Sequence, residues 1–236
     1  MNSRPFKHLV ALSVITLSGF TLQSVCAGDF EDGVALYEQQ EFTEAAKSFQ
    51  SAANKGNADA QFNLGLMYLN GEGIEQDYQK ARALFQQSAE QNNVRAQVNL
   101  ARMYAKAKGV APDYKTAVIW FTKAAELGYA DAQYSLGVLY VNGQGAPLNY
   151  TKARELFELA AEQNNASAQY QLGLMYFKGK GLRMDLTEAY KWLTLAGNYD
   201  DAALYRDYVA KKMSKDQIEE AQALADDWKP KNGAKK

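Results

Sequence analysis

The sequence predicts an all-α protein, an α-solenoid of antiparallel helix pairs. Three observations lead to this fold class. A pattern of small and apolar residues recurs four times at a spacing of 36 residues, the apolar residues within each copy follow a helical period, and no insertion or deletion separates the copies. A unit of this length cannot bury enough apolar surface alone, so the copies must stack on one another.

The first half of each copy predicts one helix. Leu64, Met67 and Tyr68 fall at positions i, i+3 and i+4, which lie on one helix face. Gly71 and Gly73 follow and end the helix, because glycine accepts the left-handed conformation of a helix end; the second copy keeps only Gly109. A glutamine recurs in register in every copy, and we expect it to bond between helices: Gln61, Gln97, Gln133 and Gln169.

The second half of each copy predicts a second helix. Asp77 and its equivalents Asp113, Asn149 and Asp185 stand where the first free amides of a helix need a side-chain oxygen. Ala81, Leu84, Phe85 and Ser88 then form an apolar stripe. Because Gly65 and Ala81 are small, we expect the two helices to cross closely at these residues.

The flanks predict additional helices at both ends of the array. Residues Gly33, Leu36, Ala45, Phe49 and Ala52 have the spacing of a shorter helix pair. Ser214 and Gln217 form a capping box that opens a final helix, which closes the last core and stops at Pro230. The predicted segments are a signal peptide at 1–27, a short N-terminal repeat at 28–57, repeats at 58–93, 94–129, 130–165 and 166–199, capping helices at 200–229 and a disordered basic tail at 230–236, in one domain of about twelve helices.

The N-terminus has the features of a secretory signal. Arg4 and Lys7 precede an apolar run from Leu9 to Leu22 that is too short for a permanent membrane anchor. We expect cleavage after Ala27 and export to the periplasm or beyond the cell. The alternative is a lipoprotein acylated at Cys26, although Val25 stands where lipoprotein signals carry Gly, Ala or Ser. Loss of 1–27 would remove two basic residues from a chain of net charge −1 and leave −3, which argues against a nucleic-acid partner.

The chain has one histidine, His8, and one cysteine, Cys26, and both lie in the predicted signal. The mature chain would therefore lack the Ser-His-Asp arrangement, cysteine nucleophiles, disulfides and His or Cys metal sites. We expect no enzymatic activity, no cofactor and no metal. An enzyme, if present, would have to use carboxylates such as Glu72 or Asp77.

The repeated unit resembles the Sel1-like repeat of the tetratricopeptide-like superfamily. The resemblance rests on the pattern A-x-A-Q-x-x-L-G-x-x-Y-x-x-G-x-G followed by the second helix, and it covers residues 58 to 199. It implies a right-handed superhelix and an adaptor role in holding other proteins. The short N-terminal unit is similar to a tetratricopeptide repeat. One exported branch of the family is linked to β-lactam binding, but that branch has paired cysteines that this chain lacks.

The same resemblance implies a concave groove lined by the first helix of each pair. Its lining would come from positions −3, +1 and +4 relative to Gly65 and its equivalents: Phe62, Leu66, Leu69, Val98, Arg102, Ala105, Tyr134, Val138, Val141, Tyr170, Leu174 and Phe177. A contiguous apolar strip of this kind marks a binding face. In a tight superhelix these side chains would instead be core, and Arg102 would either grip a carboxylate or reach solvent.

We therefore predict a non-catalytic, monomeric scaffold that binds a protein or extended peptide in this groove. A hydrolase or β-lactam-interacting enzyme is the alternative. A self-assembling structural element is a third reading, against which the polar C-terminal helix argues.

Overall fold

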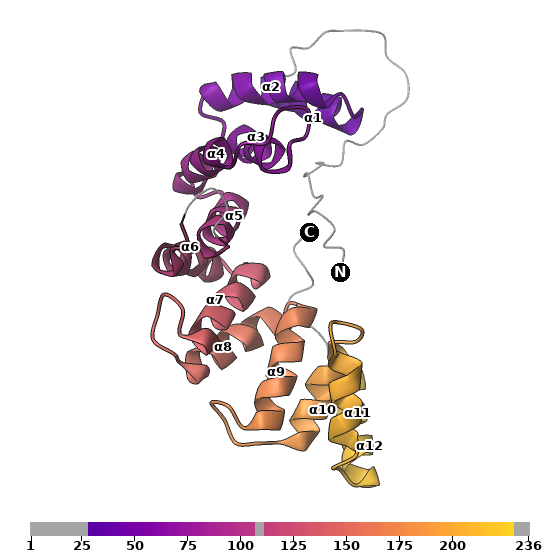
Figure 1. The fold of residues 1–236 in the computed structure, drawn as a ribbon. Coiled ribbons are helices and arrows are strands. Elements are labelled where there is room, and N and C mark those ends of the chain that lie inside the picture. Colours follow the sequence, from indigo (N-terminus) through magenta and orange to yellow (C-terminus); the bar gives the residue numbers. More distant parts are fainter. Residues whose placement is uncertain (1–27, 107–110, 229–236) are drawn as a thin grey trace. The chain divides into compact units, whose positions relative to one another are not determined.

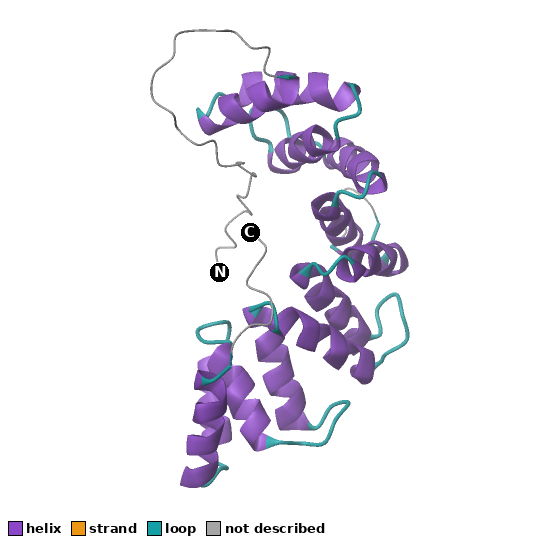
Figure 2. Ribbon diagram, turned by 180° about the vertical axis from the view of Figure 1, so that it is seen from behind, coloured by secondary structure: helices purple, strands orange, loops and turns teal. Residues whose placement is uncertain are grey.

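A computed structural model describes residues 28–106 and 111–228. The predicted signal peptide, Cys26, Gly109 and the basic tail lie outside this part of the chain. The described residues form twelve helices, which confirms the predicted fold class and the predicted number of helices. Figure 2 shows helices joined by loops and no strand among these residues.

The helices belong to two compact units that divide between Pro112 and Asp113. The first contains α1 (Asp29–Glu38), α2 (Phe42–Asn54), α3 (Ala58–Asn70), α4 (Tyr78–Glu90) and α5 (Val94–Ala105) (Figure 1). The second contains α6 (Tyr114–Glu126), α7 (Ala130–Asn142), α8 (Tyr150–Ala161), α9 (Ala166–Lys178), α10 (Leu186–Leu195), α11 (Ala202–Ala210) and α12 (Lys215–Asp226). We expected one domain. The division falls inside the second repeat, which has Ala101 where the others have glycine.

Side-chain caps begin the helices at the predicted residues. The carboxylate of Asp77 accepts from the backbone amides of Gln79 and Lys80 at the start of α4, and Asp113, Asn149 and Asp185 cap α6, α8 and α10. Ser214 and Gln217 form the predicted capping box of α12. Each cap satisfies an amide that the helix itself leaves unpaired, which fixes the helix start.

The recurring glutamines tie each repeat to the helix before it. Gln61, Gln97, Gln133 and Gln169 are buried, and each Nε2 donates to the carbonyl oxygen of the alanine eight residues earlier, at 3.3–3.4 Å. That alanine lies in the last turn of the preceding helix. In two repeats the amide oxygen also accepts, from Gln91 and Gln163. The expected bonds between helices are confirmed.

A glycine facing an aromatic ring sets the distance between the helices of a pair. A Cβ on Gly137 would lie 2.6 Å from Cε1 of Phe157, and one on Gly65 would lie 2.7 Å from Cε1 of Phe85. A Cβ on Gly33 would likewise collide with the ring of Phe49, and one on Gly173 with the side chain of Leu193. The atoms nearest to a Cβ on Gly65 belong to Phe85. Ala81, the other small residue expected at the crossing, is fully buried.

The second glycine of the loop after α7 packs against the preceding repeat. Gly145 has φ +75°, and a Cβ there would collide with the backbone of Tyr114 and Lys115 at the start of α6. Only glycine satisfies both the positive φ and this close approach.

Ala153→Leu should destabilise the protein by about 1–3 kcal/mol, because Ala153 is fully buried on α8 and the site has no room for three more carbons. The free energy of unfolding from a denaturant titration measures the effect. The matched control is Ala223→Leu at an exposed position of α12, which should leave stability nearly unchanged. Equal effects from both changes would contradict this packing.

Gly137→Ala should also destabilise the protein by about 1–3 kcal/mol, although alanine favours helix by about 1 kcal/mol over glycine. The reason is the collision with the fully buried ring of Phe157. A double-mutant cycle tests it: the same change in a Phe157→Ala background should cost much less. An unchanged cost would show that the ring does not cause the effect.

Candidate functional site

The predicted site residues lie on the first helix of each repeat, namely α3, α5, α7 and α9, here called the A helices; α4, α6, α8 and α10 are the B helices. These residues differ in how much of their surface is exposed to solvent. Phe62, Val98 and Tyr170 are buried, with 4 %, 2 % and 6 % of their surface exposed. The remaining predicted residues are half-buried: Leu66, Leu69, Arg102, Ala105, Tyr134, Val138, Val141, Leu174 and Phe177.

The separation follows position in the helix turn, except at Tyr134, which is half-buried although it occupies the same repeat position as the buried Phe62 and Tyr170. Residues three before the glycine turn toward the B helix of their own repeat, since the ring centroids of Phe62 and Phe85 are 5.9 Å apart and those of Tyr134 and Phe157 are also 5.9 Å apart. Phe62 and Tyr170 therefore belong to the core rather than to an open lining. The positions one and four after the glycine keep part of their apolar surface accessible.

A loop of the chain itself covers the tyrosines of the second unit. Tyr199 lies in the segment between α10 and α11, and its ring centroid is 5.8 Å from that of Tyr170. Its hydroxyl also interacts with that of Tyr134 on α7. The segment holds two left-handed residues, Gly197 and Asp200, which turn the chain back toward these rings.

This covering changes the acidity of both tyrosines. Burial raises the pKa of Tyr134 above its ordinary value, and the hydroxyl of Tyr199 and the carboxylate of Asp200 raise it further. Burial, followed by the negative charge of Asp200, raises the pKa of Tyr170 to about 12. Both phenols stay neutral at physiological pH; Tyr170 packs against the rings of Tyr199 and Tyr205, and Tyr134 also bonds to the hydroxyl of Tyr199.

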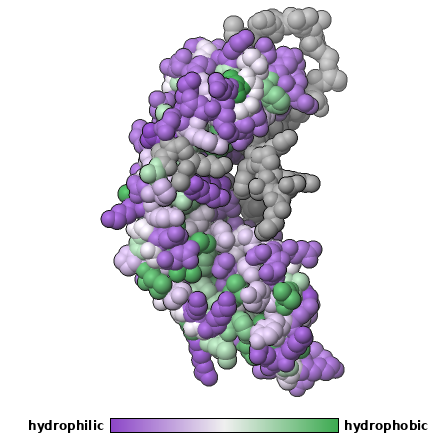
Figure 3. All heavy atoms as spheres, in the orientation of Figure 1, coloured by the Kyte–Doolittle hydropathy of each residue, from purple (hydrophilic) through white to green (hydrophobic). Residues whose placement is uncertain are grey.

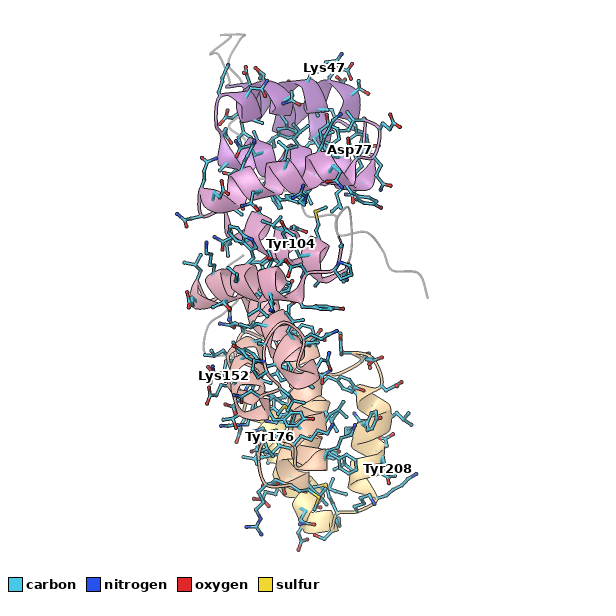
Figure 4. The ribbon with its side chains drawn as sticks, turned by 60° about the vertical axis from the view of Figure 1, so that its left-hand side comes forward. Lys47, Asp77, Tyr104, Lys152, Tyr176 and Tyr208 are labelled. Carbon is cyan, nitrogen blue, oxygen red and sulfur yellow. The ribbon has the colours of Figure 1, made fainter. Side chains whose placement is uncertain are left out.

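Farther along α9 the predicted face continues onto α11. Phe177 packs edge-on against Tyr208, with ring centroids 5.6 Å apart. Figure 4 shows Tyr208 on α11, and Figure 3 shows apolar side chains at the surface of this unit. Leu174 and Phe177 pack against a core cluster that includes Val209 of α11.

The two carboxylates considered for catalysis have structural partners. Glu72 accepts a hydrogen bond from the hydroxyl of Tyr37, whose pKa is raised by burial and by this carboxylate. Asp77 caps α4, and its bonds to backbone amides hold the pKa of the carboxyl below its ordinary value. Within residues 28–106 and 111–228, no group of three or more His, Cys, Asp or Glu residues is placed to hold a metal ion.

A cleft of about 520 Å³ lies between the loop before α10 and the start of α12. Its lining contains none of the predicted site residues: Tyr176, Leu182, Arg183, Met184, Asp185, Leu186, Thr187 and Gln217. In the same part of the chain, no helix has the length and apolar character that a membrane crossing requires.

A family model of the Sel1 repeat matches residues 58–93, 94–129, 130–165 and 166–198. The chain belongs to the Sel1 repeat family. Proteins of this family are mostly non-catalytic scaffolds that take part in protein interactions.

Two solved structures give the same fold. One is a protective antigen of uropathogenic Escherichia coli with an SLR fold, 31% identical, with a TM-score of 0.78 over 84% of this chain and 44% of that one. The other is a Sel1 repeat protein from Oxalobacter formigenes, 28% identical, with a TM-score of 0.71 over 83% of this chain and 82% of that one. This Sel1 repeat chain thus spans less than half of the antigen's length. A comparison with curated protein sequences gives no match.

The sequence reasoning missed Tyr199 and the exposed residues of α11. Tyr199 lies just beyond the last repeat, where no register predicts its direction. The signal that could have revealed it is the aromatic spacing of Tyr199, Tyr205 and Tyr208 after the array, which is dense for a segment expected only to cap.

Stability should fall between pH 10 and pH 12 because of Tyr170. Its pKa is near 10 when unfolded and about 12 when folded, so its contribution is complete below pH 10 and is lost as pH rises through 12. The contribution is about 1–3 kcal/mol. Urea titrations at pH 8, 10 and 11.5 should show a smaller decline for Tyr170→Phe than for the unchanged chain. Parallel declines would contradict this assignment.

Proposed function

We propose that this Sel1 repeat protein is a non-catalytic scaffold that holds another protein or an extended peptide against the A helices. One observation carries the proposal: on α3, α7 and α9 the positions one and four after the glycine are apolar and half-buried, whereas α5 has Arg102 and Ala105 there. They are Leu66 and Leu69 on α3, Val138 and Val141 on α7, and Leu174 and Phe177 on α9.

The apolar side chains at these positions leave surface exposed that the fold does not bury and that a partner could cover. Val138, Val141, Leu174 and Phe177 pack on core clusters with one side and keep the other side accessible. Water contact with this remaining surface costs free energy that a partner would recover, at roughly 25 cal/mol per Å² covered. The buried neighbours Phe62, Val98 and Tyr170 hold the A helices in place beneath them.

The enzyme alternative has no comparable support, because Glu72 and Asp77 are engaged in a hydrogen bond to Tyr37 and in a helix cap. We further propose that the protein acts as a monomer outside the cytoplasm after cleavage behind Ala27. The mass of the mature protein tests the cleavage site, since acylation at Cys26 would give a heavier, lipid-modified N-terminus.

Photo-crosslinking tests the scaffold proposal. A benzoylphenylalanine residue at Leu66 or Val138 should give one discrete adduct with a partner in the cell that makes the protein. The controls carry the same probe at Ala83 on α4 and Lys152 on α8, both exposed on B helices. Leu69→Glu should reduce the adduct at position 66 about tenfold or more while leaving the thermal unfolding temperature nearly unchanged, because a half-buried contact residue is lost.

Two results would contradict the proposal. Equal adducts from the A-helix probes and the B-helix controls would show unspecific capture. A folded protein that gives no adduct at 66 or 138 would show that the A helices bind no partner.

A further inference from the structure

The outer face of α11 carries apolar side chains that the fold does not need there. Leu204 exposes 67 % of its surface, the largest value among the exposed large apolar residues of the described chain, and Tyr208 exposes 49 %. The two residues are four apart, so they lie on one face of the helix.

A role in capping the end of the array does not explain why this face of α11 is apolar. Terminal units of a repeat array need a polar outer surface to stay soluble. α12 meets this requirement with exposed Lys215, Asp216, Glu219 and Glu220. α11 does not, although it follows the last repeat directly.

Residues of α11, and Lys212 just after it, join the end of α9 in one cluster, here called the α11 patch: Phe177, Lys178, Leu204, Tyr205, Tyr208, Lys212. Tyr208 connects its parts, since its ring centroid is 5.6 Å from that of Phe177 and 4.9 Å from Nζ of Lys212. Nζ of Lys178 is 5.9 Å from the ring centroid of Tyr205. Two aromatic rings thus each carry a lysine ammonium at an apolar surface.

The charge of the α11 patch is positive and uncompensated. Lys178 and Lys212 are exposed, as is the adjacent Lys211, and within residues 28–106 and 111–228 none of the three forms an ion pair. Arg206 and Asp207 form an ion pair with each other at 3.0 Å, so their charges cancel. An ammonium resting on a ring still has N–H groups free to donate to a carboxylate.

We propose that the α11 patch binds an acidic peptide segment of a partner protein, with an aliphatic or aromatic anchor side chain flanked by Asp or Glu. The anchor covers Leu204 and Tyr208, and the carboxylates pair with Lys178 and Lys212. This inference deepens the proposed scaffold function and rests on it: Phe177 belongs to the A-helix face, so the patch extends that face onto α11.

The arrangement favours a peptide over an anionic membrane. Asp200 and Asp201 stand just before α11, so an extended anionic surface lying on this end of the chain would meet their negative charges as well as the lysines. A peptide can place two carboxylates at the lysines and avoid the acidic positions. Complementary charge of this kind selects the partner and speeds encounter.

The test begins with selection of a random dodecapeptide phage library on the purified protein. Selected peptides, made with a fluorescein label, are then titrated by anisotropy against the unchanged protein and three variants. Lys178→Glu/Lys212→Glu reverses the charge of the patch, and Tyr208→Ala removes its central ring. Lys152→Glu is the matched control, because Lys152 is also an exposed lysine above a tyrosine ring, that of Tyr140 at 5.6 Å.

We expect the selected peptides to be enriched in Asp and Glu beside an apolar residue. Charge reversal should weaken their binding about tenfold or more, and 0.5 M NaCl should weaken it too. Tyr208→Ala should weaken binding while lowering the unfolding temperature by only about 2–4 °C, since it removes one edge-on ring contact with Phe177, and Lys152→Glu should have no effect. A repeat selection on the charge-reversed variant should enrich Lys and Arg instead, which an effect on folding would not produce.

The other outcomes separate this inference from the scaffold proposal. Selected peptides that bind the charge-reversed variant equally well would overturn the inference and leave the scaffold proposal standing. No selected peptide at all would count against both. Co-sedimentation with vesicles containing 30% phosphatidylserine, lost on charge reversal, would assign the patch to a membrane. A dimer by light scattering that Tyr208→Ala dissolves would assign it to a second copy. Either result would also overturn the inference.

Discussion

The contact between a helical glycine and the ring that faces it determines how closely two helices of a pair can approach. Gly137 and Phe157 show it most clearly, because both are buried and a single methyl group between them would overlap the ring. A different contact joins neighbouring repeats, since Gln133 and Gln169 donate to alanine carbonyl groups in the last turns of α6 and α8. The bond of Gln133 follows a repeat that has Ala101 in place of the glycine, so the glycine governs packing within a repeat while the glutamine ties one repeat to the next.

The same contact divides the A helix into a buried and an accessible part. A residue three positions before the glycine lies one turn back on the side of the ring, so Phe62 packs against Phe85 and becomes core. Residues one and four positions after the glycine, such as Leu66 and Leu69, turn away from the B helix and stay half-buried. Phe62, Leu66 and Leu69 are all apolar, so the difference in their burial comes from the side of the helix that they occupy rather than from hydrophobicity.

Local and periodic features could be predicted from the sequence, because they depend on few neighbours. The caps at Asp77 and Ser214 need only the following helix turn, and the bonds of the glutamines repeat because the register repeats. The split of the predicted lining into core and surface could not be predicted, because it depends on which ring each residue faces. The covering of Tyr134 by Tyr199 lies outside any register and joins residues far apart in the chain.

The C-terminal end shows why one segment can both close an array and extend its surface. Trp228, just after α12, packs edge-on against Trp192 of α10, with ring centroids 6.1 Å apart, and so shields the last core on the B-helix side. α11 packs on α9 and α10 through its buried residues Ala202 and Val209. α12 and Trp228 already shield the B-helix side of the last core. The exposed face of α11 that carries Leu204 and Tyr208 is therefore not needed to close the core, which leaves it available as contact surface.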